Sequence, residues 1–274
     1  MRVGFIGVGN QGEPIARKIV EGGFDLTLWA RRPESLEPFA DTAATSAATP
    51  AELAAVSDLV EVCVYSDDDV LDVVLRPDGV LAGMAERGII AIHSTVVTET
   101  VAEVAAAAEP RGVAVIDAPV SGGRAVAEVG EMLVMMGGDP AVADRCRPVF
   151  ATFATSVVHI GPLGTASIAK AINNMVLGAN ITMALDVFDF ADELGLDKAG
   201  LAEALSNGSG STRAIGIVAQ SGFSWEFQFQ NSAPYFRKDL EVMRDIARGA
   251  GVPLPGALEE LADRIANGSV DHLS

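Results

Sequence analysis

Lys170 and Asn174 lie four residues apart in a long run without proline. In an α-helix this spacing places both side chains on one face. A lysine ammonium can donate a proton to a carbonyl oxygen as hydride arrives at the carbon, and can take it back in the reverse direction. Asn174 would orient that oxygen or the lysine. The alternative is a solvated helix lysine, and the apolar neighbours argue against it: Ile168, Ala169, Ala171, Ile172, Met175 and Val176.

A glycine motif near the start of the chain fits a dinucleotide. Gly7, Gly9 and Gly12 form G-x-G-x-x-G after an apolar run at residues 2–6 and before an apolar helical pattern. Gly7 would make the tight turn, Gly9 would admit a pyrophosphate, and Gly12 would let the helix pack on the strand. A glycine-rich turn of another α/β protein is the alternative. The expected cofactor loop comprises Gly7, Gly9, Asn10, Gln11 and Gly12.

Two arginines follow the second expected strand, residues 26–30. In NAD-binding units an acidic residue about 20 residues past the glycines binds the ribose hydroxyls, whereas an arginine there suits a 2′-phosphate. Ala30 stands at the acidic position, and Arg31 and Arg32 come next. Forked guanidinium groups match a phosphate. NADP(H) is therefore preferred as cofactor and NAD(H) stays possible, while two solvated loop arginines are the alternative.

Further polar residues follow the carboxyl ends of expected strands, where α/β sheets bind ligands. Tyr65 ends the expected strand at residues 59–65 and Ser66 follows it, whereas Thr95 comes two residues after the strand at residues 88–93. We expect contacts with the cofactor from Tyr65 and Ser66, whereas Thr95 could either cap the next helix or touch a ligand. Ser121, Gly122 and Gly123 can present a hydroxyl group and bare N–H groups to a substrate carboxylate.

Two other polar features at strand ends favour structural roles. Ser66 precedes three aspartates, residues 67–69. A metal site is one interpretation, but a serine cap with acids on the positive end of a helix is favoured, so no metal is expected. His93 is either an acid–base residue or a packed strand-end histidine. The second interpretation is favoured, because nothing near it in the sequence completes a catalytic pair.

The order of elements predicts two domains. Short apolar runs are expected as strands at residues 2–6, 26–30, 59–65, 88–93, 113–117, 132–136 and 155–160. Their alternation with helices indicates an α/β fold with an N-terminal Rossmann doubly wound sheet, residues 1–161. A long helix at about 165–194 would link it to an all-α C-terminal domain, residues 162–274. Within that domain, helices are expected at 196–206, 214–220, 236–249 and 256–267.

Composition excludes several classes of protein. The 274-residue chain has a net charge of −18, which disfavours nucleic-acid binding. No apolar run indicates a membrane span, and no signal peptide is recognised. Only two cysteines occur, Cys63 and Cys146, far apart in the chain. Free thiols in a cytoplasmic protein are therefore expected.

Four motifs in order resemble the β-hydroxyacid dehydrogenase family, which includes 3-hydroxyisobutyrate dehydrogenases, tartronate-semialdehyde reductases and glyoxylate/succinic-semialdehyde reductases. The resemblance extends over nearly the whole chain. The motifs are Gly4-Phe-Ile-Gly-Val-Gly-Asn-Gln-Gly12, Asp117-Ala-Pro-Val-Ser-Gly-Gly123, Gly161-x-x-Gly164-x-x-x-x-x-Lys170-x-x-x-Asn174 and Lys238-Asp239-Leu240.

The resemblance implies roles for residues that the chain shares with the family. Lys170 would be the catalytic residue with Asn174 in support, and residues 121–123 would receive the substrate carboxylate. Thr95 would lie near nicotinamide and substrate, and Lys238 would close over the cofactor. The resemblance also implies a homodimer or homotetramer. We therefore expect an NADP(H)-dependent oxidoreductase that interconverts a short 3-hydroxy acid and its semialdehyde or keto form.

Departures from the family pattern leave the substrate open. Ala166 replaces a usual glycine, and Ser167 replaces a frequent glutamine. Six aromatic residues lie ahead of Lys238: Phe223, Trp225, Phe227, Phe229, Tyr235 and Phe236. They either line the substrate pocket or pack in the helical core, and the sequence favours neither role. A non-catalytic NADP(H)-binding regulatory or scaffold protein is one rival. Imine reductases share the architecture but carry an aspartate or tyrosine at the lysine position, which argues against that activity.

Overall fold

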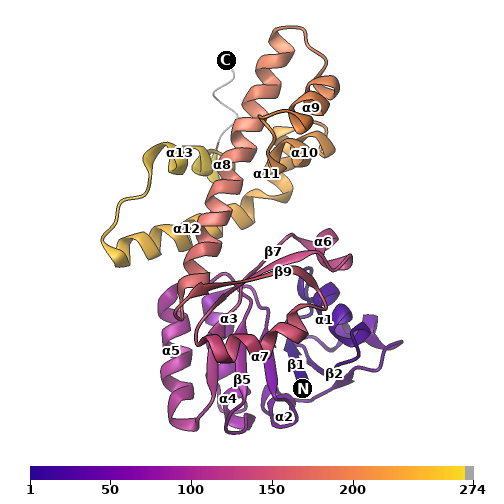
Figure 1. The fold of residues 1–274 in the computed structure, drawn as a ribbon, viewed down its shortest axis with the longest axis vertical. Helices are drawn as coiled ribbons and strands as arrows, with labels where there is room; N and C mark the ends of the chain where they lie inside the picture. Colours follow the sequence, from indigo (N-terminus) through magenta and orange to yellow (C-terminus); the bar gives the residue numbers. More distant parts are fainter. Residues whose placement is uncertain (269–274) are drawn as a thin grey trace. The chain divides into compact units, whose positions relative to one another are not determined.

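The computed structural model describes residues 1–268, apart from the side chain of Phe229. The chain divides into two units, Met1–Lys170 and Ala171–Ser274. Every strand in the described part belongs to the first unit, and the second is helical (Figure 1). The expected fold class is confirmed: an N-terminal Rossmann-type sheet precedes a helical C-terminal part.

A nine-stranded sheet forms the centre of the N-terminal unit. Its strands are β1 (Arg2–Ile6), β2 (Asp25–Trp29), β3 (Thr45–Ser46), β4 (Leu59–Val62), β5 (Ile89–Ile92), β6 (Ala114–Asp117), β7 (Val120–Ser121), β8 (Met132–Gly137) and β9 (Ala154–Gly161). The order β3-β2-β1-β4-β5-β6 is parallel throughout and is that of a dinucleotide-binding fold. β4 and β5 are buried along their whole length, as central parallel strands require.

The far end of the sheet departs from this parallel pattern. β8 runs antiparallel to both β6 and β7, and β9 is parallel to β8. β3 and β7 have two residues each. Neither strand was expected, because two residues are too few to show an alternation of polar and apolar side chains.

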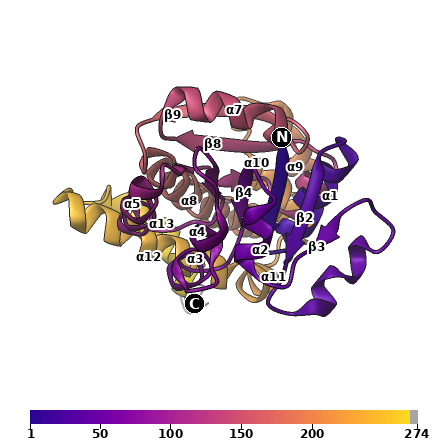
Figure 2. The same ribbon diagram turned by 90° about the horizontal axis from the view of Figure 1, so that it is seen from below.

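Helices cover both faces of the sheet. They are α1 (Gly12–Glu21), η1 (Pro33–Phe39), α2 (Pro50–Ala55), α3 (Asp67–Leu75), α4 (Val80–Gly83), α5 (Thr98–Ala108), η2 (Glu109–Arg111), α6 (Arg124–Glu128) and α7 (Pro140–Phe150). Buried side chains of α1 and α7 form one apolar core with the sheet, and those of α2, α3, α4 and α5 form the other. Figure 2 shows α7 on one side of the sheet and α2, α3 and α4 on the other. The carboxyl ends of the strands are thereby left to the loops.

One helix of 29 residues, α8 (Thr165–Glu193), begins in the first unit and continues through the second. It is followed by α9 (Lys198–Asn207), α10 (Arg213–Gln220), α11 (Trp225–Asn231), α12 (Ala233–Ala250) and α13 (Gly256–Asn267). Leu185 and Phe188 of α8 are fully buried in the core of the C-terminal unit. By length and composition α8 is apolar enough to cross a membrane, but 56% of its most apolar window is buried within the protein. A core helix passes the same test.

Both cysteines are free thiols, as expected. Cys146 lies in the core between α7 and the sheet, and burial raises the pKa of its thiol to about 12.

Candidate active site

The three glycines of the first loop have different steric surroundings. Gly7 has a φ of +100°, and a Cβ atom there would lie 2.1 Å from the carbonyl oxygen of Cys63. A Cβ atom at Gly12 would lie 2.0 Å from the carbonyl oxygen of Gly7. Apart from Gly9 itself and its two chain neighbours, no atom of the described residues lies within 4 Å of a Cβ atom built at Gly9. The protein therefore needs Gly7 and Gly12 for its own packing, whereas the bare backbone at Gly9 faces open space.

The N-terminus of α1 is available to an anion. Among residues 1–268, no side chain caps this helix at Gln11, whereas Ser66 caps α3 and Asp139 caps α7. The first N–H groups of a helix attract a phosphate through their hydrogen-bonding capacity and the helix dipole. An uncapped helix that follows open backbone at Gly9 therefore fits the diphosphate of a dinucleotide.

Arg31 forms an ion pair with α3. Its Nη2 atom lies 2.7 Å from Oδ1 of Asp69 and 3.8 Å from Oδ2 of Asp72. Burial alone would raise the pKa of Asp69, but hydrogen bonds from Arg31 and Ser66 outweigh it and hold that pKa below its usual value. The Arg31 side chain is still 65% exposed, and Arg32 is exposed next to it. An incoming phosphate would compete with Asp69 for Arg31.

The capping interpretation of residues 66–69 is confirmed. The hydroxyl of Ser66 accepts a hydrogen bond from the backbone N–H of Asp69 and donates one to its carboxylate. The carboxylate of Asp67 accepts hydrogen bonds from the backbone of Val97 and the side chain of Thr100. Within the described residues, no group of three or more His, Cys, Asp or Glu side chains is arranged to hold a metal ion. Tyr65, just before the cap, is 57% exposed.

His93 is a packed strand-end residue, as the favoured interpretation has it, and its side-chain partner comes from a segment 32 residues away. Its Nε2 atom lies 3.0 Å from Oε2 of Glu61, and both side chains are 0% exposed. Its Nδ1 atom lies 2.6 Å from the carbonyl oxygen of Ala118 and must be the donor, because a carbonyl only accepts. The rings of Phe150 and Phe153 pack edge-on against it. The pair ties three neighbouring strand ends together in the core.

The loops after β4 and β5 are also joined. The hydroxyl of Ser94 accepts a hydrogen bond from the N–H of Val64 and donates one to its carbonyl. Thr95 follows and is partly buried. Ser94 therefore holds Thr95 beside the loop that carries Tyr65 and Ser66.

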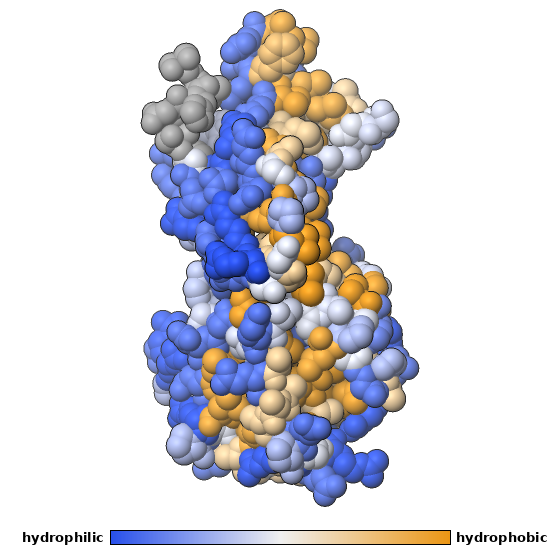
Figure 3. All heavy atoms as spheres, turned by 90° about the vertical axis from the view of Figure 1, so that its left-hand side faces the viewer, coloured by the Kyte–Doolittle hydropathy of each residue, from blue (hydrophilic) through white to orange (hydrophobic). Residues whose placement is uncertain are grey.

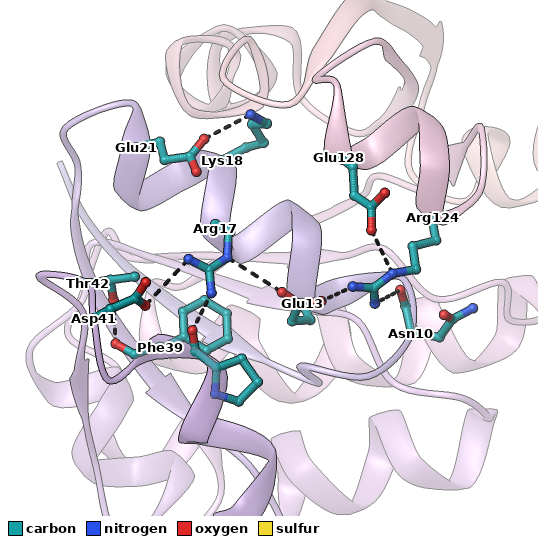
Figure 4. A network of polar contacts seen from close by, with 11 residues as sticks. Asn10, Glu13, Arg17, Lys18, Glu21, Phe39, Asp41, Thr42, Arg124 and Glu128 are labelled. Atoms are coloured by element: carbon teal, nitrogen blue, oxygen red, sulfur yellow. Dashed lines mark hydrogen bonds and ion pairs between the residues drawn. The ribbon is translucent and has the colours of Figure 1, made fainter.

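Arg124 connects the predicted substrate loop to the glycine loop (Figure 4). It follows Gly123 directly, and its Nη1 atom donates a hydrogen bond of 3.2 Å to the carbonyl oxygen of Asn10. The same guanidinium pairs with Glu13 of α1 and Glu128 of α6. Ser121 and Gly122 are partly buried in this loop, and Gly123 is exposed. Arg124 thus places the end of the loop beside Asn10.

Lys170 and the substrate loop are linked through Asp117, the last residue of β6. The buried carboxylate of Asp117 accepts hydrogen bonds of 2.8 Å from the N–H groups of Gly164 and Ser167, at the start of α8. Lys170 lies one turn further along α8 and is 9% exposed, so the interpretation as a solvated surface lysine is wrong.

Asn174 and Lys238 both contact Asp239 within the C-terminal unit. The side-chain amide of Asn174 donates a hydrogen bond of 2.5 Å to Asp239 and accepts one of 2.9 Å from Asn173. Nζ of Lys238 lies 3.7 Å from the same aspartate. Asp239 therefore fixes the orientation of the Asn174 amide and joins α8 to α12.

The aromatic residues ahead of Lys238 divide into two groups. Phe223, Trp225 and Phe236 pack against the helical core, and Trp225 donates a hydrogen bond of 2.9 Å to Asp189. Phe227 and Tyr235 are about half exposed. The side chain of Phe229 lies outside the described part of the structure.

Three residues that hold predicted site residues or their neighbours in place were not among the predicted ones. Asp117 and Asp239 stand inside two of the recognised motifs, so their position was a signal that could have been used. Arg124 follows such a motif, but its partners Asn10 and Glu13 are more than 100 residues away in the chain. No pattern of residue types indicates that pairing.

Comparison with known proteins shows that family models described as NAD-binding match both parts of the chain. A family model described as the NAD binding domain of 6-phosphogluconate dehydrogenase matches residues 2–161. Another, described as NAD-binding of NADP-dependent 3-hydroxyisobutyrate dehydrogenase, matches residues 164–269. An uncharacterised oxidoreductase of Shewanella frigidimarina is 33% identical over 93% of this chain and 88% of its own length. The NAD-dependent L-serine dehydrogenase of Pseudomonas aeruginosa is 27% identical over the same shares of both chains.

Solved structures agree with these matches. The 3-hydroxyisobutyrate dehydrogenase of Mycobacterium tuberculosis with L-serine has a TM-score of 0.83 at 26% identity and covers 99% of this chain and 95% of its own. A protein named Psf3, in complex with NADP+ and 2-OPP, has a TM-score of 0.81 at 25% identity over 95% of this chain and 91% of its own. An imine reductase of Streptomyces aurantiacus shares the fold at 18% identity and a TM-score of 0.69, over 97% and 93%. The chain therefore belongs to the β-hydroxyacid dehydrogenase family and is an NAD(P)-dependent oxidoreductase of the hydroxyacid dehydrogenase type.

Proposed function

We propose that this protein is an NADP(H)-dependent oxidoreductase that interconverts a short 3-hydroxy acid and its semialdehyde or keto form. The proposal is carried by Lys170, a lysine with 9% exposure. It lies in the helix whose first turn is bonded to the strand end that leads into Ser121, Gly122 and Gly123. A buried lysine on a helix that Asp117 bonds to the start of such a carboxylate-type loop suits a substrate that carries both an acid and a carbonyl group.

We assign most of the site residues to binding of nucleotide and substrate, and Lys170 to proton transfer. The bound nucleotide supplies or accepts the hydride. The glycine loop and the N-terminus of α1 would hold its diphosphate, and Arg31 and Arg32 would hold its 2′-phosphate. The rest of the nucleotide would contact Tyr65, Ser66, Thr95 and Lys238. Residues 121–123 would bind the substrate carboxylate, with Thr95 nearby. Lys170 would donate a proton to the carbonyl oxygen in reduction and accept it in oxidation, and Asn174, fixed by Asp239, would orient that oxygen.

The direct test is a spectrophotometric screen of 3-hydroxy acids and semialdehydes with both nucleotides. We expect turnover of at least one short 3-hydroxy acid and none of its methyl ester, because the ester lacks the carboxylate. Binding of NADPH without turnover of any compound would favour the non-catalytic alternative. Reduction of cyclic imines in preference to semialdehydes would favour the imine reductase alternative.

Cofactor preference is expected to shift in opposite directions in two variants. Arg31→Asp should lower the ratio of kcat/KM with NADP(H) to that with NAD(H) by about 10- to 100-fold, since a charged hydrogen bond contributes about 1.5–3 kcal/mol. Asp69→Asn should raise this ratio, because it weakens the competitor that lies 2.7 Å from Arg31. The measurement is steady-state kinetics with both nucleotides.

A control for this pair is Arg248→Asp. Arg248 is an exposed arginine of α12 that also pairs with an aspartate, Asp245. We expect it to leave the ratio unchanged. An unchanged ratio in Arg31→Asp would contradict the assignment of the 2′-phosphate to Arg31.

We propose a homodimer or a homotetramer, supported by an apolar stripe along α8. Large apolar side chains with 37–60% exposure lie three, four or seven residues apart on this helix: Ile172, Val176, Met183, Val187 and Phe190. Such spacing places them on one face, and exposed apolar surface of this extent marks an interaction site. Figure 3 shows a hydrophobic and a hydrophilic side of the C-terminal unit.

The stripe gives a test of assembly. Val187→Glu is expected to reduce the molar mass, measured by size-exclusion chromatography with light scattering, to that of a smaller assembly or a monomer, because a buried carboxylate in the contact is costly. Val252→Glu changes a valine with 60% exposure in the loop between α12 and α13 and should leave the mass unchanged. Equal masses for wild type and both variants would exclude the stripe as the contact.

A further inference from the structure

Asp117 caps a helix that begins far away in the sequence. Its Oδ1 atom accepts the N–H of Gly164, 47 residues later, and its Oδ2 atom accepts the N–H of Ser167, 50 residues later, each at 2.8 Å. The side chain is 0% exposed. Both oxygens of a fully buried carboxylate are therefore used on the first turn of α8, where the positive end of the helix dipole stabilises the negative charge.

The sheet itself sets the position of this carboxylate. Asp117 is paired with Gly137 of β8, and a Cβ atom at Gly137 would lie 2.3 Å from Oδ1 of Asp117. Any side chain at position 137 would displace the carboxylate. The backbone after Asp117 is held as well, since the carbonyl oxygen of Ala118 accepts the hydrogen bond from His93.

Two parts of the proposed site meet at this residue. The backbone after Asp117 continues through Ala118 and Pro119 into Ser121, Gly122 and Gly123, and the carboxylate fixes Ser167, which precedes Lys170 by less than one helical turn. We infer that Asp117 is a positioning residue that fixes the amine of Lys170 relative to the loop that binds the substrate carboxylate. This inference rests on the proposed function of Lys170. Asp117 itself does not act on the substrate.

The chemistry of the side chain makes the inference specific. Each of the two oxygens of the Asp117 carboxylate accepts one N–H group. An asparagine has only one oxygen, so its NH2 group would face the other N–H donor. Asp117→Asn should therefore release Gly164 or Ser167 and let the first turn of α8 shift. A misplacement of about 1 Å at a catalytic group can cost about 10²-fold in rate.

Asp139→Asn provides a matched control in the same unit. Asp139 caps α7 by accepting the N–H groups of Ala141 and Val142 at 2.7 and 3.2 Å, and α7 carries none of the proposed site residues. Gly137→Ala is a second test variant, because it displaces the carboxylate of Asp117 without removing its charge. All variants are compared well below their melting temperatures, with kcat corrected for the folded fraction.

For Asp117→Asn and Gly137→Ala we expect kcat to fall at least about 10-fold, with the nucleotide Kd within about twofold of wild type. The primary isotope effect measured with 4-deuterated nucleotide should rise, because hydride transfer becomes slower than the other steps. Asp139→Asn should keep wild-type kcat and isotope effect. Wild-type kcat in both test variants, or an equal fall in kcat in Asp139→Asn, would overturn the inference.

Backbone hydrogen exchange separates this inference from the proposed function. Residues 164–170 should exchange faster in Asp117→Asn but not in Asp139→Asn, because Oδ1 of Asp139 accepts both N–H groups and an asparagine retains that oxygen. This measurement needs no turnover. A wild-type protein that turns over no substrate would refute the proposed function, whereas unchanged exchange at residues 164–170 in Asp117→Asn would refute the anchoring role of Asp117.

Discussion

Replacing Lys170 with methionine is expected to lower turnover at least about 10²-fold while the nucleotide still binds, because general acid–base catalysis contributes about 10²–10⁴-fold. Methionine keeps an unbranched apolar chain in a site where the lysine is 9% exposed, but it has no proton to give. The measurements are kcat under saturating conditions and nucleotide Kd by fluorescence titration.

Two further variants make this test sharper. Lys170→Arg keeps the positive charge but cannot release a proton, because a guanidinium stays protonated in proteins. It should lose turnover as methionine does if proton transfer is the role of the lysine. Lys198→Met serves as the control, since Lys198 of α9 pairs with Asp189 and Asp192 away from the proposed site residues. Normal turnover in Lys170→Met would refute the proposed mechanism.

The second large effect is expected from a methyl group at either of two glycines. Gly12→Ala places its Cβ atom 2.0 Å from a backbone oxygen, and overpacking of this kind costs about 1–3 kcal/mol or more of the free energy of unfolding. We therefore expect a clear fall in melting temperature together with loss of nucleotide binding. Thermal unfolding and nucleotide titration measure the two effects.

Gly9→Ala should separate binding from stability. Its Cβ atom would project into open space, so the free energy of unfolding should change by less than about 0.5 kcal/mol. The nucleotide Kd should rise at least about 10-fold, by about 1.4 kcal/mol of lost binding, because the methyl group occupies the space proposed for the diphosphate. Unchanged nucleotide affinity in Gly9→Ala would contradict the proposed path of the cofactor over this loop.

Local sequence patterns were reliable where a single segment carries the information. The glycine motif, the apolar strands and the long run without proline each depend on neighbours within a few residues. The alternation of strands with helices therefore predicted the doubly wound sheet, and the run without proline predicted the long helix. The same patterns did not predict the antiparallel direction of β8, because strand direction in a sheet depends on how the chain returns and not on the residues of the strand.

Contacts between distant segments had no local signature. Arg31 was assigned to a phosphate, and only the fold places it against Asp69, 38 residues later. Glu61 lies in an apolar strand with nothing in its own segment to suggest a partner, and the pairing of β4 with β5 brings it to His93. Buried polar groups need hydrogen-bonding or charged partners, but the sequence alone does not show which residues these are.

By itself, the sequence determined the fold class, the nucleotide loop and the two residues, Lys170 and Asn174, that share a helix face, because each depends on spacing along one element. Only the tertiary structure decided that Lys170 is buried, that Arg124 joins two loops and that Asp117 caps α8. Sheet pairing and helix packing bring together residues that are 50 or more positions apart, and the partners of a buried charge are selected by that packing.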